Sequence, residues 1–524
     1  MAFPASTLWE IRAAGNADNG GGFVWEGIGA SYDWIQSGSG TNEWYLDELS
    51  MSAVRSVAFT AHSKSAPKGT AGSLALGEWD FADNDSLGYS TVYVRLPDGA
   101  DPNGKQANFV KIQEGTDYSQ QDAAEQVYTD LVIDGTLNTK ITSATRAFSS
   151  ADIGNVVRIV SGTGWTVQRR YIVSIDGTAA IMDGSMGTLG STGGNGRMGG
   201  AMTMTPPNMN AVVSGNDIAV RAGTHTLTGN TTVANGSVSK KVRFFGYQTT
   251  RGDNPVGTDR PLIACGAFLF GSGSYNEFSH FQFTGTAAAL LRLQTASWAA
   301  NISAHNSSET ANRAAIELQG AGAGLRKFYA QSDAGYGVRL ASTSNDAHYG
   351  FVVDCGGRGI SNEGQRNTIS NVIVARCPTG VYTSAANLTL LDSDIQGSTV
   401  AGLNLVGGNQ NKVINVCISD SAVGITATAG NEDAHMIQNV NVHNNTVNFA
   451  NVFLNGNYRE IDPQYTDPAT NDFRIGPNLK ALITEPGANE GLKAGTQNYR
   501  DFAVLQRVEG SAAGGGQAAY AYVF

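Results

Sequence analysis

One pair of residues, a small one followed by an aliphatic one, recurs through the middle of the chain. It reads Ala315-Ile316, Gly337-Val338, Gly359-Ile360, Gly380-Val381, Gly402-Leu403 and Gly424-Ile425. The steps between the aliphatic members are 22, 22, 21, 22 and 22 residues, which is too regular for glycines scattered by chance. The stretch from Ile316 to Ile425 is therefore a short structural repeat, in which we expect the glycine to supply a turn conformation that a Cβ atom would penalise.

A second apolar group keeps step with the first. It alternates at a period of two, with Phe351, Val353 and Cys355 expected inward in one coil and Ile373, Ala375 and Cys377 in the next. A repeat of about 22 residues is too short for two helices but holds three short strands with tight turns. Stacked coils of this size form a parallel β-helix. The leucine-rich horseshoe is the competing short-repeat fold, and its dense leucine signature is missing here.

The composition is that of an ordered, turn-rich all-β protein. Of 524 residues, 65 are glycine and 15% are charged, while 41% are hydrophobic, which is more than a disordered chain carries. No run of 18 apolar residues is present, and residues 1–15 lack the basic start and apolar centre of a signal peptide. We expect a soluble protein that does not insert into a membrane and is not conventionally secreted.

The net charge and the cysteines limit which partners, metals and cofactors we expect the chain to bind. The net charge of −11 argues against an unspecific grip on nucleic acid. Cys355 and Cys377 are 22 residues apart, so we expect them at equivalent inward sites of neighbouring coils, as small buried hydrophobes. No close pair of Cys or His completes a metal site, and no nucleotide-binding or protease motif is present. We therefore expect no nucleic-acid partner, no metal and no cofactor.

Changes in residue composition and pattern along the chain predict five segments. They are a loop-rich N-terminal attachment segment (1–40), a small β module (41–116), a second small module with one short helix (117–211), the β-helix (212–475) and a C-terminal cap or tail (476–524). The helix is expected over Gln120–Thr129 with Ser119 as its cap, and a second short one over Leu46–Met51. Residues 184–200 read as a surface loop. Trp9, Trp25 and Trp34 pack either on a partner or on their own chain.

Several segments resemble known β-helix and phage-particle proteins. Gly215–His225, with Gly246–Asp253 and Arg260–Ile263, resembles the entry coil of pectate-lyase-like right-handed β-helices, and Asp467–Ile475 resembles their exit. Thr7–Arg12, Asn19–Phe23 and Asp117–Ala124 are similar to the beginnings of β-helix proteins carried by tailed bacteriophages, and Arg95–Pro102 to small modules of phage particles. The resemblance implies a right-handed β-helix, a place in the virion after assembly in the host cytoplasm, and a homotrimer.

The candidate functional site consists of charged residues that we expect on the outer face of the β-helix. Counting along the coils places Asp354, Arg376 and Asp394 on one outer face in successive rungs, where they form either a charge ladder or a sugar-binding or sugar-cleaving groove. Asp392 and Asp394 are both expected to face outward, at a spacing that suits an acid and a base flanking a water. Arg376 beside Asp394 would lower the pKa of that carboxyl, which suits a base.

The function expected from these features is structural and adhesive. The chain is predicted to be a bacteriophage virion protein, either a tail fibre or tailspike that touches a host-surface glycan or a decoration protein on the capsid, in contact with other virion proteins. The alternative is a tailspike-type polysaccharide depolymerase, a glycosidase or lyase, in which Asp354, Arg376, Asp392 and Asp394 would be catalytic.

Overall fold

The protein is described by a computed structural model that covers residues 3, 7–28, 34–38, 42–49, 54–59, 65–82, 90–103, 110–430, 434–454, 456, 458–460, 462–463, 465, 468–470, 472–474, 491–493, 503–505 and 521–523. It divides into two compact units. The first consists of Met1–Met204, Ala211–Ala222 and Arg243–Asn254, and the second of Thr205–Asn210, Gly223–Val242 and Pro255–Phe524. Most of the expected C-terminal cap, 476–524, lies outside the described residues, and the segment boundaries expected from the sequence stay predictions.

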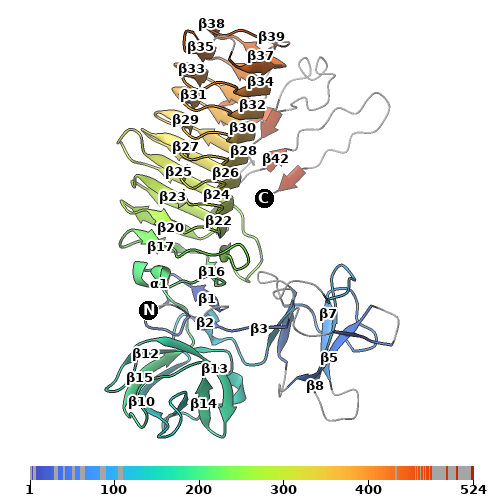
Figure 1. The fold of residues 1–524 in the computed structure, drawn as a ribbon, viewed down its shortest axis with the longest axis vertical. Helices are drawn as coiled ribbons and strands as arrows, with labels where there is room; N and C mark the ends of the chain where they lie inside the picture. Colours follow the sequence, from blue (N-terminus) through green and yellow to red (C-terminus); the bar gives the residue numbers. More distant parts are fainter. Residues whose placement is uncertain are drawn as a thin grey trace. The chain divides into compact units, whose positions relative to one another are not determined.

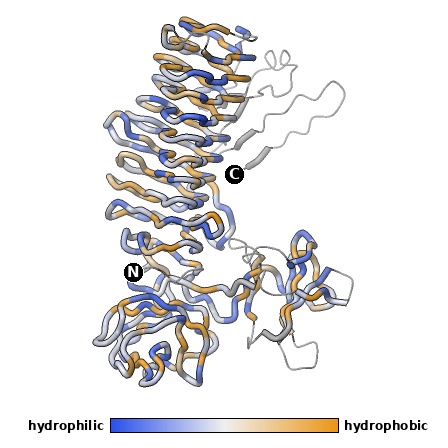
Figure 2. Tube along the Cα trace, in the orientation of Figure 1, coloured by the Kyte–Doolittle hydropathy of each residue, from blue (hydrophilic) through white to orange (hydrophobic). Residues whose placement is uncertain are grey.

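The second unit is a solenoid of parallel strands, stacked coil upon coil (Figure 1). The parallel solenoid has about 11 turns of roughly 22 residues each, and the residues that the structure describes contain almost no helix, so the expected parallel β-helix is confirmed. Hydrophobic and hydrophilic residues alternate along its coils (Figure 2). This alternation lets each coil bury one set of side chains and expose the other.

Two long sheets run the length of the solenoid. One contains, in spatial order, β22 (Asn276–Gly285), β24 (Trp298–Asn306), β26 (Gly324–Ser332), β28 (Asp346–Val353), β30 (Thr368–Ala375), β32 (Thr389–Gln396), β34 (Lys412–Ser419), β37 (Val440–His443) and β39 (Tyr458–Arg459). The other contains β18 (Thr231–Thr232), β21 (Phe270–Gly271), β23 (Ala289–Leu293), β25 (Ala314–Leu318), β27 (Tyr336–Leu340), β29 (Arg358–Asn362), β31 (Thr379–Thr383), β33 (Ala401–Leu405), β35 (Val423–Ala427) and β38 (Val447–Ala450).

Shorter elements complete this unit. They are α1 (Pro206–Asn210), the parallel pair β17 (Thr224–Thr226) and β20 (Leu262–Gly266), η3 (Gly257–Asp259), β36 (Met436–Gln438), η4 (Pro468–Thr470) and the antiparallel pairs β40 (Asp472–Arg474) with β41 (Gly491–Lys493) and β42 (Ala503–Leu505) with β43 (Ala521–Val523). Among the described residues no helix is long and apolar enough to span a membrane.

The sequence repeat is the register of the second sheet. Its aliphatic members are consecutive partners in the parallel ladder, in the order Ile316, Val338, Ile360, Val381, Leu403 and Ile425. Each of them is at most 1% exposed. Full burial of such a side chain stabilises the fold by about 1.5–3 kcal/mol, so this one column is a large part of the solenoid core.

The glycine of the repeat has a different role from the one expected. Gly337, Gly359 and Gly380 lie inside strands β27, β29 and β31, and none of them has a positive φ. A Cβ atom added to Gly359 would lie 2.3 Å from Cγ1 of Val374 on the first sheet. The small residue is therefore required because the two sheets approach closely inside the coil, and the predicted turn conformation is wrong.

The residues of the first sheet that point into the core are not the ones predicted by counting every second residue. Val352 and Cys355 both face the glycine of β27, so Val352 points inward, whereas the alternation predicted Phe351 and Val353. The cause is Asp354, whose φ of 51° turns the chain between the two inward residues. The expected inward positions of Cys355 and Cys377 are confirmed, and both thiols are buried.

Single left-handed residues turn the coils at recurring positions. One column of them runs through His280, Asn301, Lys327, Tyr349, Asn371, Asp392, Asn415 and Asn439, with φ between 48° and 64°. Asparagine and aspartate adopt this conformation more readily than other residues that carry a Cβ atom. The column is also joined by side chains, because Asn415 Nδ2 donates to Asp392 Oδ1 at 3.0 Å and Asn439 Nδ2 donates to Asn415 Oδ1 at 2.5 Å.

The first unit contains a small barrel and three open sheets. The closed antiparallel barrel runs β10 (Gln126–Ile133), β11 (Lys140–Thr142), β14 (Ala179–Met182), β13 (Arg169–Asp176), β12 (Val156–Ser161) and β15 (Gly194–Met198). The open sheets are β2 (Gly22–Phe23), β1 (Leu8–Ile11), β16 (Asp217–Arg221), β19 (Val242–Tyr247); β3 (Glu26–Ile28), β9 (Val110–Gln113), β6 (Ser56–Ala58); and β4 (Ile35–Gln36), β5 (Trp44–Leu49), β8 (Ser90–Arg95), β7 (Glu78–Ala82). Two 3₁₀ turns, η1 (Tyr118–Gln120) and η2 (Ser150–Asp152), connect them.

Three local predictions for this unit are wrong. The helix expected over Gln120–Thr129 is the turn η1 followed by strand β10, and the turn is capped by Asp117, which accepts from the Ser119 N–H at 2.9 Å. Pairing within the barrel overrides the local helix signal. The described part of the helix expected over Leu46–Met51, residues 46–49, belongs to β5, and the loop expected over 184–200 contains β15. Trp9 and Trp34 are both buried within this unit, so they pack on their own chain.

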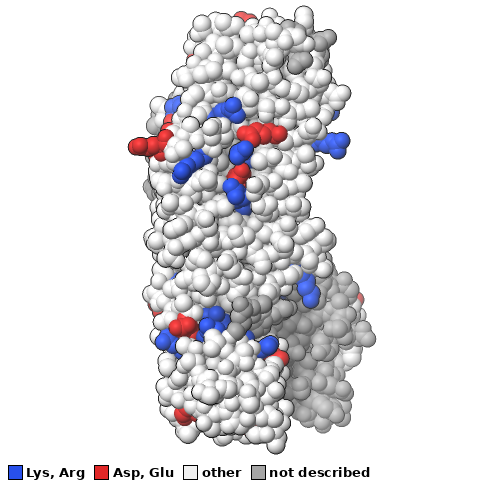
Figure 3. Space-filling model, turned by 60° about the vertical axis from the view of Figure 1, so that its left-hand side comes forward, with Lys and Arg blue, Asp and Glu red and all other residues white. Residues whose placement is uncertain are grey.

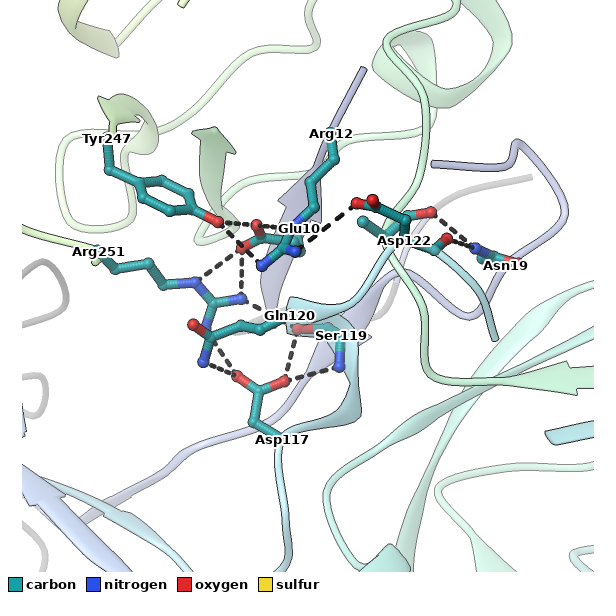
Figure 4. A network of polar contacts seen from close by, with 10 residues as sticks. Glu10, Arg12, Asn19, Asp117, Ser119, Gln120, Asp122, Tyr247 and Arg251 are labelled. Atoms are coloured by element: carbon teal, nitrogen blue, oxygen red, sulfur yellow. Dashed lines mark hydrogen bonds and ion pairs between the residues drawn. The ribbon is translucent and has the colours of Figure 1, made fainter. Parts of the chain in front are cut away.

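A buried polar network fastens the N-terminal strand β1 (Figure 4). The Glu10 carboxylate is fully buried and accepts hydrogen bonds from Arg12 Nε at 2.9 Å, from Arg251 Nε at 2.8 Å and from the Tyr247 hydroxyl. Arg251 also donates to Asp117 Oδ2 at 2.7 Å. Residues distant in the sequence are thus held by charge-assisted hydrogen bonds in a protected site.

Removing the central carboxylate should cost this unit much of its stability. We expect Glu10→Ala to lower the free energy of unfolding by about 3–5 kcal/mol, because Arg251 loses one of its two buried acidic partners. Urea denaturation followed by near-ultraviolet circular dichroism measures the change. The control is Lys140→Ala, which removes an exposed ion pair with Asp176 in the same unit and should leave the midpoint unchanged. Equal effects of the two substitutions would contradict this account.

Candidate functional site

The predicted contact between Asp354 and Arg376 is present. Arg376 Nε and Nη2 donate to the two Asp354 oxygens at 2.6 and 2.9 Å. Both are left-handed residues, with φ of 51° and 54°, at the same corner of neighbouring coils. The hydrogen bond that Arg376 donates to Asp354 raises the pKa of Arg376. Arg376 Nη1 also donates to the Pro468 carbonyl at 2.9 Å, so this arginine fastens η4 to the solenoid.

Asp394 does not continue this pair, so its predicted register with Asp354 and Arg376 is wrong. Its ladder partners are Ile373 and Cys417, and the residue that follows Arg376 in the corner column is Gly397, with a φ of 66°. Asp394 is also fully buried. It lies near Tyr465, whose pKa is raised by burial and, to a lesser degree, by the charges of Cys417 and Asp394.

Asp392 and Asp394 do not form the expected outward pair. Asp392 is a half-buried corner residue with a φ of 48°, and its carboxylate accepts a hydrogen bond from Asn415. Asp394 is buried beyond the corner, after the buried Ser393. The next residue, Ile395, points inward at Gly380, so Asp394 points away from that core but is covered by other residues, and the two carboxylates are not exposed together. The four predicted residues therefore occupy three different places, and their catalytic role stays a prediction.

A second set of charges, which the sequence reasoning missed, lies on the outer face of the other sheet. Arg292 on β23, Glu317 on β25 and Arg339 on β27 are consecutive ladder partners. Glu317 bridges the arginines, with oxygens 2.6 Å from Arg292 Nε and 3.2 Å from Arg339 Nη1. Arg339 Nη2 also lies 2.7 Å from Glu363, and that hydrogen bond raises the pKa of Arg339. We call Arg292, Glu317, Arg339 and Glu363 the Arg–Glu ladder; acidic and basic side chains lie interleaved on this side of the solenoid (Figure 3).

Aromatic rings continue the same column. Ser361 and Tyr382 are the next ladder partners after Arg339. The guanidinium carbon of Arg358 lies 3.3 Å from the ring centroid of Tyr382 and 5.3 Å from that of Tyr336. Arg358 Nη1 also donates to the Ser361 hydroxyl at 3.0 Å. Arginine guanidinium groups, glutamate carboxylates and tyrosine rings thus lie on successive coils, which are about 4.8 Å apart.

The sequence did contain a signal for this surface. From Glu317 onward, every member of the column directly follows an aliphatic residue of the repeat, as Glu317 follows Ile316, Arg339 follows Val338 and Tyr382 follows Val381. Arg292 follows Leu291, which is the ladder partner of Ile316. The residue after an inward one faces outward on a strand. Reading those positions in register gives Arg, Glu, Arg, Ser and Tyr, which is the row that the structure shows.

No metal centre accompanies these residues. In the part of the chain that the structure describes, no group of three His, Cys, Asp or Glu side chains could hold an ion. The buried thiol of Cys355 has a pKa well above its ordinary value because burial disfavours the thiolate. Burial therefore disfavours a reactive thiolate at Cys355.

The fold places the chain among the parallel β-helix proteins. It is similar to an alginate lyase from Paenibacillus sp. str. FPU-7 (9% identity, 49% of this chain and 98% of the lyase, TM-score 0.35), to the Dettilon tailspike protein (10%, 44% and 55%, TM-score 0.30) and to the pectate lyase Pel9A (13%, 56% and 87%, TM-score 0.31). A comparison with protein-family models and one with curated sequences found no match.

Proposed function

We propose that this chain is a glycan-binding virion protein of a tailed bacteriophage, built as a rigid β-helical shaft. The Arg–Glu ladder with Arg358 and Tyr382 carries the proposal, because a repeating polar surface on fixed rungs suits a repeating polymer. Guanidinium groups and carboxylates hydrogen-bond hydroxyls, and tyrosine rings offer flat apolar faces to sugar rings. The virion assignment is supported by the resemblance of Thr7–Arg12 and Asp117–Ala124 to phage β-helix proteins.

Adhesion is favoured over cleavage by the state of the four predicted catalytic residues. Arg376 is engaged by Asp354 and by the Pro468 carbonyl. Asp394 is fully buried, whereas a general acid or base must reach the bond it cleaves. A tail fibre or tailspike fits a glycan-binding surface better than a capsid decoration protein does, and in either place the ends of the shaft contact other virion proteins.

Truncating the ladder should weaken glycan binding. We expect Arg339→Ala and Arg358→Ala each to lower affinity for the host polysaccharide at least tenfold, about 1.4 kcal/mol. Isothermal titration with polysaccharide purified from the host measures the change. The matched control is Arg326→Ala, since Arg326 also stacks on an aromatic ring, that of Trp298 at 4.8 Å, but lies on the other sheet. Unchanged binding by the first two variants would place the glycan elsewhere.

The purified protein should bind the host polysaccharide without shortening it. Size-exclusion chromatography of the glycan after incubation tests this. If the glycan is shortened, and Asp394→Asn abolishes the shortening without changing the thermal midpoint, the depolymerase function is correct and adhesion alone is wrong.

The shaft should be a homotrimer in solution. Light scattering coupled to size-exclusion chromatography is expected to give three times the chain mass of 54.8 kDa. A monomer mass at micromolar concentration would contradict the trimer. A density map of the intact virus fitted with the trimer then distinguishes the tail from the capsid surface.

A further inference from the structure

Three arginines stand in one row across the barrel of the first unit. Arg158 on β12 is the direct cross-strand partner of Arg169 on β13 and of Arg197 on β15. Directly opposed residues of an antiparallel pair point to the same face of the sheet. The neighbouring Val157 and Met198 belong to the barrel core, so the three arginines, which we call the arginine row, face outward.

The row gathers positive charge in a poorly solvated place. Arg169 is only 7% exposed, and burial together with the charge of Arg158 lowers its pKa to about 9. Burial lowers the pKa of Arg158 too. Asp18 is the acidic group that counteracts both shifts. Like charges placed directly opposite each other on a sheet are destabilising, so this arrangement costs the free barrel stability.

The hydrogen-bond donors of the row are divided between two tasks. Arg169 Nε donates to the carbonyls of Asn19 and Gly20 at 3.2 and 3.1 Å, and its Nη2 donates to that of Ala17 at 2.5 Å. Arg158 Nε, by contrast, is buried with no hydrogen-bond partner among the described residues. Within the same residues, no carboxylate lies within ion-pair distance of Arg158 or Arg197. Arg169 thus contributes a positive charge that is fixed in place, while Arg158 and Arg197 have N–H groups that can donate hydrogen bonds to a ligand.

We propose that the arginine row binds a single oxyanion, a phosphate, sulfate or sugar carboxylate group, held by Arg158 and Arg197 in the field of Arg169. Guanidinium groups match such anions because their planar forks donate two parallel hydrogen bonds. A bound anion would satisfy the buried Arg158 Nε and neutralise the like-charge row. The site is independent of the glycan-binding surface on the solenoid.

Isothermal titration of the full chain with inorganic phosphate, sulfate and glucuronate, at constant ionic strength in chloride, tests the site. We expect binding of at least one of them, weakened at least tenfold by Arg158→Gln and by Arg197→Gln. Phosphate or sulfate alone points to a free or esterified oxyanion, whereas glucuronate points to an acidic glycan. The matched control is Arg170→Gln, the next residue on β13, which already lies 3.5 Å from Asp183 and should leave binding unchanged.

Thermal melting gives a second readout that a purely structural arginine would not produce. Without anion, Arg158→Gln should raise the melting temperature, because it relieves the repulsion within the row; the anion should then no longer stabilise the variant. No binding at 10 mM of any of the three anions, or equal binding by wild type, Arg158→Gln and Arg197→Gln, would overturn the proposal. If Arg158→Gln fails to fold, Arg197→Gln alone decides.

Discussion

The solenoid depends on one constraint: a coil of roughly 22 residues cannot bury its own apolar side chains and must bury them against the next coil. The backbone bonds that join coils hold them about 4.8 Å apart, so equivalent residues stack directly on one another. A column of aliphatic residues, Ile316 to Ile425, follows from this requirement. So does the glycine that precedes four of them, from Val338 to Leu403, because the two sheets approach too closely there for a Cβ atom.

Stacking also acts on the outer face. It places equivalent outward-facing residues of neighbouring coils next to each other, whether their charges attract or repel. On the second sheet the chain alternates Arg292, Glu317 and Arg339, so each charge meets its opposite. The barrel does the reverse and places Arg158 between two arginines. A row of like charges persists only where something offsets its cost, and an anionic ligand is the agent that the free donors suit. The charges of the Arg–Glu ladder are therefore compatible with one another without a ligand, whereas the like charges of the arginine row are not.

The period of the sequence predicted the β-helix, because the register of the core is written directly in the spacing of the aliphatic residues. The candidate site could not be predicted as well, since a count at a period of two fails wherever a left-handed residue turns the coil. Asp354 lies between the inward Val352 and Cys355 and shifts the phase by one. At Asp394 the count gave the direction correctly, since Ile395 is inward, but it could not show that other residues cover this carboxylate. The short helix expected over Gln120–Thr129 failed for another reason: barrel partners far along the chain made Gln126–Ile133 a strand.

The two faces of the solenoid differ in what they can do chemically. Catalysis by a carboxylate pair needs two groups that reach the substrate from different environments. Around Asp392 and Asp394 the environments do differ, but burial withdraws one member of the pair from the surface. Binding needs only groups that repeat at the interval of the coils, and the column from Arg292 to Tyr382 provides such groups on successive rungs. A fold made by repetition therefore produces a binding surface more directly than it produces a single active site, and this chain's outer residues follow that distinction.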